Sequence, residues 1–158
     1  MIVAIGLDVC DVDRIRRALE ARSGPRFRER VFTAAERAYC EARRRGRFAS
    51  YAARFAAKEA AMKALGTGWA RGVGWQDFEV VRAAGGPPQL VVHGKAAEIA
   101  RRRGMVRWLL ALTHTDASAV ASVVVEDGAG VTAAAGAGRR RRRGGGAGSV
   151  PRRPTARR

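Results

Sequence analysis

The alanine-rich segment at residues 48–65 restricts the fold more than any other part of the chain, because it predicts one long helix. Alanine is the best helix former, and Gly66 follows directly as a residue suited to end a helix. On this helix Phe55, Glu59, Met62 and Gly66 follow one stripe that looks apolar. Glu59 therefore lies on or beside a stripe where a carboxylate is expensive to bury unless it is paired or bound to a cation.

The remaining patterns predict an α+β fold with a largely antiparallel sheet packed with helices. A capping box at Thr33 and Glu36 starts a helix that should run to about Arg45. An earlier helix should begin at Asp11 or Asp13 and end at Gly24. The expected order is strand, three helices, two strands, helix and two strands. In residue numbers these are a strand at 2–12, helices within 11–24 and at 34–45 and 48–65, two strands within 77–94, a helix at 95–104, and strands at 106–115 and 117–126.

The first strand, residues 2–12, shows a clear alternation. Its larger apolar side chains, Ile5, Leu7 and Val9, should point to one face, and Gly6, Asp8 and Cys10 to the other. Aspartate is depleted in strands, and small neighbours leave room for a ligand or another backbone. Asp8 is thus a candidate carboxylate for a magnesium site with a second carboxylate such as Glu59; the alternative is an aspartate that caps the next helix.

The charge of the chain is concentrated in a C-terminal tail. Residues 128–158 hold nine arginines and no acid, and they account for +9 of the formal net charge of +17, which leaves +8 on residues 1–127. We therefore expect a domain at residues 1–127 and a disordered Gly/Ala/Arg-rich tail at residues 128–158. The basic domain favours an anionic partner: phosphate, nucleic acid or an acidic protein.

Cysteine usage and the N-terminus indicate the compartment. Cys10 and Cys40 form no CxxC pair, so neither a disulfide framework nor a zinc site is indicated. The apolar N-terminal run lacks a basic leader and is interrupted by Asp8. A cytoplasmic location is the expectation.

Cations near Glu59 fit a phosphate substrate. Arg54, Lys58 and Lys63 share its helix, although Lys63, four residues after Glu59, equally suits a surface salt bridge. The segment Gly66-Thr67-Gly68 lets a backbone approach a phosphate, or simply ends the helix. His114, near the end of an apolar strand, is either a structural residue or a ligand-binding one.

Four segments in this order resemble the holo-acyl-carrier-protein synthases, the small bacterial 4'-phosphopantetheinyl transferases: IGLDVCDVDRI, RVFTAAE, RFAAKEAAMKALGTG and LTHTDASAVASVVVE. The most specific parts are G-x-D at Gly6 to Asp8 and F-x-x-K-E-x-x-x-K at Phe55 to Lys63. The resemblance spans roughly residues 2–126. It implies transfer of the 4'-phosphopantetheine arm of coenzyme A to a serine of apo-acyl carrier protein, with release of 3',5'-ADP, in support of fatty acid biosynthesis.

The resemblance also implies roles for individual residues and an assembly. Asp8 and Glu59 would hold Mg²⁺ against the coenzyme A pyrophosphate, and Lys63 would neutralise that pyrophosphate. The remaining contacts would come from three sets: Arg54 and His114 on the nucleotide phosphates, Gly66, Thr67 and Gly68 lining that pocket, and Arg14 and Arg17 docking the acidic carrier protein. The family fold would assemble as a homotrimer with active sites between protomers.

Elementary chemistry agrees with this reaction and leaves two alternatives open. Phosphoryl transfer needs neutralisation of developing negative charge and a route for the nucleophile's proton, for which Glu59 is the candidate base. A nucleic-acid-binding module would use the Arg139–Arg143 run and the basic domain, but it does not explain Asp8 and Glu59. A catalytically silent binder of coenzyme A or carrier protein is the other alternative.

Overall fold

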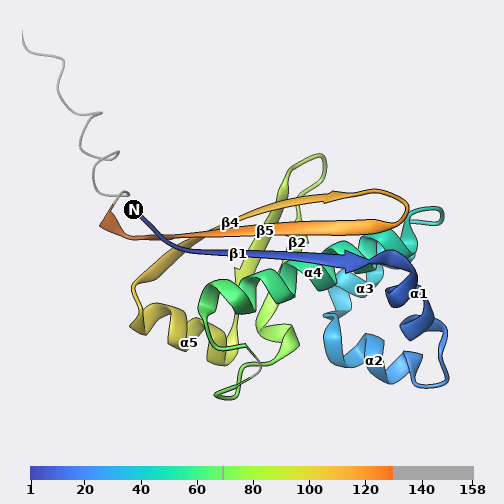
Figure 1. Cartoon of the computed structure of the whole chain (residues 1–158), viewed down its shortest axis with the longest axis horizontal. Helices are drawn as coiled ribbons and strands as arrows, with labels where there is room; N and C mark the ends of the chain where they lie inside the picture. The colour runs from blue at the N-terminus through green and yellow to red at the C-terminus, as the bar shows by residue number, and fades with distance from the viewer. Residues whose placement is uncertain (69, 130–158) are drawn as a thin grey trace, which may run out of the picture.

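The computed structural model describes residues 1–68 and 70–129 (Figure 1). The predicted tail, 128–158, lies outside the described residues from residue 130 onward. The elements, in chain order, are β1 (Ile2–Asp11), α1 (Val12–Glu20), α2 (Gly24–Val31), α3 (Ala34–Glu41), α4 (Arg47–Leu65), the 3₁₀ helix η1 (Trp75–Asp77), β2 (Phe78–Arg82), β3 (Pro88–Val92), α5 (Gly94–Arg102), β4 (Met105–His114) and β5 (Ser118–Asp127).

The strands form two antiparallel sheets, which confirms the predicted α+β class. The larger sheet has the order β1-β5-β4, and β2 pairs with β3 in a separate hairpin. Both hairpins expected from the sequence are present, β2-β3 and β4-β5. In the larger sheet Asp8 of β1 lies opposite Ala121 of β5, and His114 of β4 lies opposite Ala119.

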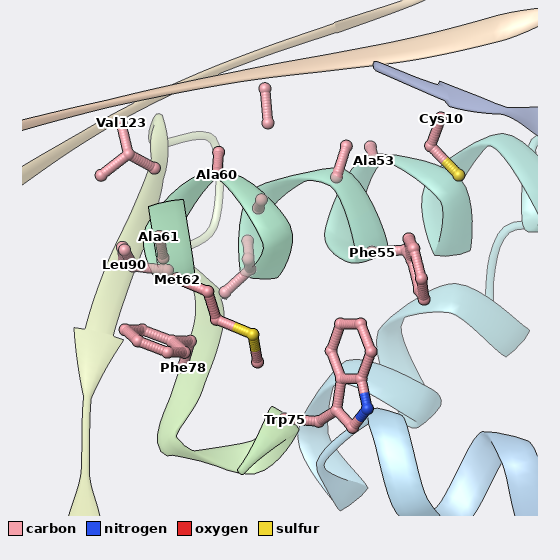
Figure 2. Close-up of a cluster of buried hydrophobic side chains, with 14 of the residues drawn as sticks. Cys10, Ala53, Phe55, Ala60, Ala61, Met62, Trp75, Phe78, Leu90 and Val123 are labelled. Atoms are coloured by element: carbon pink, nitrogen blue, oxygen red, sulfur yellow. The ribbon is translucent and has the colours of Figure 1, made fainter. Parts of the chain in front are cut away.

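Helix α4 packs along one face of the larger sheet, mainly against β1 and β5. The close approach is possible because the facing residues are small. A Cβ added to Gly6 would lie 1.9 Å from the carbonyl oxygen of Ala60. Figure 2 shows Ala53 and Ala60 on the side of α4 that faces the strands, and Phe55 and Met62 on the side away from them. The alanines therefore form the helix and also bring its backbone against β1.

The α-helices lie on one side of the larger sheet (Figure 1). The alternation predicted for β1 is confirmed, and its large apolar side chains lie on the face opposite α4: Ile5, Leu7 and Val9 are 64%, 56% and 61% exposed. Leu109 of β4, opposite Val124 of β5, extends this apolar face. A contiguous exposed apolar sheet face is unusual for a monomer and typical of an interaction surface.

The predicted helix boundaries were partly wrong at the N-terminal half. The first helix ends at Glu20, and Gly24 opens α2, which the sequence reading missed because Gly24-Pro25 looked like a stop. Proline is tolerated in the first turn of a helix. Helix α3 carries the predicted capping box at Thr33 and Glu36 but ends at Glu41 rather than near Arg45.

The long helix is as predicted. Helix α4 ends at Leu65, and Gly66 caps it in the left-handed conformation with φ 71°. Among the described residues no helix is long and apolar enough to cross a membrane.

Candidate active site

The first group of predicted site residues lies where β1 crosses α4. Asp8 is on the α4 side of β1, between the buried Gly6 and Cys10, and its side chain is 16% exposed. Lys63 of α4 donates to Asp8 Oδ1 at 2.8 Å and to the carbonyl oxygen of Leu7 at 3.0 Å. Asp8 is therefore an aspartate with a cation beside it, held between a strand and a helix.

Glu59 lies one helical turn before Lys63 and belongs to the same neighbourhood. Burial is the main cause that raises the pKa of the Cys10 thiol to about 11; Arg14 opposes the shift, and Asp8, Asp11 and Glu59 add to it. Both carboxylates therefore lie close enough to the Cys10 thiol for their charges to act on it. The thiol itself stays protonated at neutral pH and is 1% exposed, as expected for a structural residue.

Asp8 and Glu59 together suit a hard divalent cation. Within residues 1–68 and 70–129 no cluster of three or more His, Cys, Asp or Glu side chains could hold a metal. Mg²⁺ commonly uses one or two protein carboxylates and completes its shell with waters and substrate phosphates. The ammonium of Lys63 on Asp8 shows that this carboxylate accepts a cationic partner, so the donor set fits the expected ion.

The second group surrounds a cavity of about 210 Å³ on the β4 side of the larger sheet. Its lining includes Arg54 of α4, Arg82 of β2 and His114 of β4, together with Tyr39, Ser50, Ala53, Val80, Pro88 and Leu112. The structure therefore brings the predicted pair, Arg54 and His114, into one cavity. Arg54 is only 4% exposed, and its Nε finds no hydrogen-bond partner among the residues that the structure describes.

The cavity is strongly cationic. The guanidinium carbon of Arg54 lies 3.9 Å from the ring centre of Tyr39, and that of Arg43 lies 4.8 Å from it. Burial raises the pKa of Tyr39, but a hydrogen bond from Arg82 and the charges of Arg43, Arg54 and Arg82 outweigh it and lower that pKa. A buried guanidinium with unused hydrogen-bonding capacity in such a field is suited to bind an anion.

The two groups face different sides of the same helix. Arg54 and Glu59 are five residues apart on α4, which turns their side chains about 140° away from each other. Asp8 is on β1 and His114 on β4, and these strands are the opposite edges of the larger sheet. One chain therefore carries two separate groups of predicted site residues. The carboxylate group comprises Asp8, Glu59 and Lys63, and the anion cavity is the one lined by Arg54, Arg82 and His114.

Lys58 was predicted among the phosphate-binding cations, and that prediction is wrong. Its side chain is 0% exposed and forms an ion pair with Glu36 at 2.8 Å. It is not among the residues that line the cavity, so its charge is used in the interior rather than on a ligand.

Comparison with known proteins identifies the family. Residues 4–123 match the model of the 4'-phosphopantetheinyl transferase superfamily. A holo-[acyl-carrier-protein] synthase of Solibacter usitatus is 50% identical over 127 residues, which cover 80% of this chain and 100% of the relative. The chain belongs to the holo-[acyl-carrier-protein] synthase family. A second member of that family, from Anaeromyxobacter dehalogenans, is 54% identical over 131 residues, covering 80% of this chain and 97% of its own length.

Solved holo-[acyl-carrier-protein] synthases share the fold. The Neisseria meningitidis enzyme superposes with a TM-score of 0.71 at 30% identity, covering 80% of this chain and all of that one. The Bacillus anthracis enzyme, solved in complex with CoA (3',5'-ADP), has a TM-score of 0.65 at 34% identity and covers 80% of this chain and 98% of that one. The enzymatic class expected from the sequence is thereby confirmed.

The remaining predicted residues of this synthase lie on surfaces. Gly66 and Gly68 both have positive φ, 71° and 53°, in the segment that follows α4. Arg14 and Arg17 are exposed on α1, where the Nε of Arg17 lies 3.1 Å from Asp13. Their contacts with ligand and carrier protein stay predictions.

Of the residues that line the anion cavity, sequence reasoning found only Arg54 and His114; the most important ones that it missed are Tyr39 and Arg82. Tyr39 sits on α3 and Arg82 at the end of β2, distant in sequence from each other and from Arg54. No local pattern marks either residue, because only the packing of the β2-β3 hairpin against α3 and α4 brings them together.

Proposed function

We propose that this synthase transfers the 4'-phosphopantetheine moiety of coenzyme A to a serine of apo-acyl carrier protein, depends on Mg²⁺ and releases 3',5'-ADP. In this proposal it works in the cytoplasm and supports fatty acid biosynthesis. The observation that carries the proposal is the pair of half-sites: an anion cavity around Arg54 and His114, and a carboxylate group at Asp8 and Glu59.

The nucleotide end of coenzyme A fits the anion cavity. That end carries a 3'-phosphate and a pyrophosphate, and both need neutralising donors. Arg54 offers a guanidinium whose Nε has no partner among the described residues, and His114 and Arg82 line the same space. Bidentate contact between arginine and phosphate is stronger than contact between neutral groups.

The reacting end of coenzyme A would lie at the carboxylate group. The serine oxygen of the carrier protein attacks the β-phosphorus of coenzyme A, and a new O–P bond forms as the bond to the 3',5'-ADP oxygen breaks. Glu59 accepts the serine proton, as a base within reach of the nucleophile must. Lys63, 54% exposed beside Asp8, neutralises charge that moves to the leaving pyrophosphate oxygen.

Asp8 and Glu59 would hold Mg²⁺, and the ion when bound supplies positive charge to the pyrophosphate oxygens. The residues present favour this arrangement, because two carboxylates with one lysine leave room for phosphate oxygens as further ligands.

A homotrimer would join the half-sites across protomers. The exposed apolar face formed by Ile5, Leu7, Val9 and Leu109 supports burial against further copies of the chain. A ring of identical head-to-tail contacts would bring the carboxylate group of one protomer toward the anion cavity of the next. The placement of the two half-sites on opposite edges of the sheet favours this arrangement.

The carrier protein would dock on α1. Arg14 and Arg17 are exposed there, close to the start of the strand-to-helix connection that follows Asp8. A positive surface steers an acidic partner and raises the association rate, so replacing both arginines should raise KM for the carrier protein.

The direct test is a mass assay. The protein is incubated with Mg²⁺, coenzyme A and apo-acyl carrier protein, and the carrier protein should gain the mass of one phosphopantetheine. Coenzyme A binding without a mass change on any carrier protein tried would instead identify a silent binder.

Nucleic acid contact by the basic tail is the second candidate function. Truncation after residue 127 separates the two, because the transferase should keep its activity without the tail. If the truncated chain loses both its transferase activity and its RNA binding, the nucleic-acid alternative is favoured.

A further inference from the structure

Glu36 and Lys58 form an ion pair that is completely buried. Both side chains are 0% exposed, and the ammonium nitrogen lies 2.8 Å from Glu36 Oε2. Neither residue lies in the carboxylate group or lines the anion cavity, so the reaction as described above does not use them.

The polar groups around this pair are well satisfied. Besides Glu36, Lys58 donates to the carbonyl oxygens of Trp75, at 3.1 Å, and Phe78. Glu36 accepts from the backbone N–H of Thr33 through Oε2 and from the backbone N–H of Val80 through Oε1, each at 2.9 Å. A charged pair with this many hydrogen bonds can persist in the interior.

Two of these bonds go to the free edge of β2. This strand pairs only with β3 in the described sheets, so its alternate N–H and C=O groups point away from β3. The carbonyl of Phe78 takes a hydrogen bond from Lys58, and the N–H of Val80 gives one to Glu36. The ion pair therefore binds the edge of β2 as a neighbouring strand would.

The elements that the pair joins form three of the walls of the anion cavity. Helix α3, which Thr33 caps, carries Tyr39, and α4 carries Arg54 one turn before Lys58. Strand β2 contributes Val80 and Arg82 to the lining. Two consecutive helices and a later strand, each of which lines the anion cavity, thus meet at one buried ion pair.

Stability alone gives a weak reason for such a pair. The cost of desolvating two buried charges commonly cancels their attraction, and an apolar replacement is often as stable. Positional control is a stronger reason, because displacing a binding group by about 1 Å can cost about 100-fold in function.

We propose that Glu36 and Lys58 are positioning residues that hold α3, α4 and β2 at the spacing needed for Arg54, Arg82 and His114 to bind the nucleotide of coenzyme A. The inference rests on the proposed function, in which that nucleotide occupies the anion cavity. It predicts that the pair sets the affinity for coenzyme A and has little effect on the carboxylate half-site.

The test replaces both charges by amides in the full chain, Glu36→Gln with Lys58→Gln. We expect KM for coenzyme A and Kd for 3',5'-ADP to rise at least about 10-fold, since a loosened cavity misplaces its donors. kcat at saturating coenzyme A and KM for the carrier protein should stay within about 3-fold. The control is Lys95→Gln with Glu98→Gln, an exposed pair at 2.7 Å, which should change none of these values.

A second variant keeps the test decisive if the double variant does not fold. Glu36→Asp retains the charge but is one methylene shorter, so it cannot keep its bonds to Lys58, Thr33 and Val80 together. It should raise KM for coenzyme A several-fold while kcat is kept. A folded variant with a lower Tm and an unchanged KM for coenzyme A would overturn the inference.

The proposed function can fail separately. If the wild-type chain binds no 3',5'-ADP, or if Arg54→Met leaves KM for coenzyme A unchanged, the nucleotide does not use the anion cavity. If Arg54→Met raises KM and the Glu36 variants do not, only the positioning role is wrong.

Discussion

Gly6→Ala tests the contact between β1 and α4 on which the carboxylate group depends. The added Cβ would lie 1.9 Å from the carbonyl oxygen of Ala60, 2.8 Å from its carbonyl carbon and 2.9 Å from the backbone nitrogen of Ala64. All three atoms belong to helix backbone and cannot rotate away. Ordinary contact begins near 3.4 Å, so α4 and β1 must separate by about 1.5 Å.

This displacement gives the expected magnitude. Overpacking a dense core costs about 1–3 kcal/mol, and a clash with backbone belongs at the upper end. For a domain of this size about 3 kcal/mol lowers Tm by about 10 °C. Because Asp8 is on β1 and Glu59 on α4, transferase activity should also fall at temperatures where the variant is still folded.

The assay is denaturant unfolding followed by circular dichroism, at one fixed protein concentration because assembly would contribute to stability. Gly74→Ala is the matched control: a Cβ there meets nothing within 4 Å, and the residue has no positive φ. A Gly6→Ala protein within about 0.5 kcal/mol of wild type, with normal activity, would refute the packing argument.

Four further predictions follow from the same structure. Glu59→Gln should keep the fold and abolish transfer, and near-normal turnover in the mass assay would contradict the role of Glu59 as base. The hydrogen bond from Thr33 is the main cause that lowers the pKa of Glu79 from its ordinary 4.5. The ionised Glu79 therefore stabilises the fold above pH 4.5, and this stabilisation is lost as the pH falls through the lowered pKa. Glu79→Gln should therefore lower Tm at pH 7, and this loss should shrink as the pH is taken below 4.5; a loss that does not change with pH would argue against this. Cys10, whose pKa burial raises to about 11, should resist iodoacetamide at pH 8 until the protein is unfolded; rapid alkylation of the native protein would show that the thiol is accessible. Leu7→Asp, on the apolar face, should leave a folded chain of monomer mass by light scattering, whereas an unchanged larger mass would exclude that face as the assembly surface.

Local sequence signals predicted much of the fold because they act within a few residues. The capping box at Thr33 and the glycine after Leu65 mark helix ends by hydrogen bonds and backbone conformation that any context would favour. The predicted helix end at Gly24-Pro25 was wrong, because this pair suits the start of a helix as well as its end. Only the close approach of Gly24 to the backbone of Leu19 distinguishes the two.

The roles of the two lysines on α4 depend on long-range packing, which local sequence patterns do not predict. Lys58 and Lys63 look alike on the helix, yet one is buried against Glu36 and the other pairs with Asp8. The difference arises from the neighbouring elements, α3 and β2 around Lys58 and β1 beside Lys63. Tyr39 and Arg82 were not predicted, because only the folded chain brings them together in the anion cavity.

The most direct test of the central claim, that each active site joins half-sites of two protomers, is complementation between two inactive chains. Glu59→Gln and Arg54→Met are unfolded together in equal amounts, refolded as a mixture, and assayed for transfer to apo-acyl carrier protein. If the chains form rings at random and each site joins the carboxylate group of one chain to the anion cavity of the next, about a quarter of the sites should be intact. At a coenzyme A concentration where neither parent shows activity, the refolded mixture should reach about a quarter of wild-type activity. A mixture as inactive as its parents would contradict a site shared between two protomers.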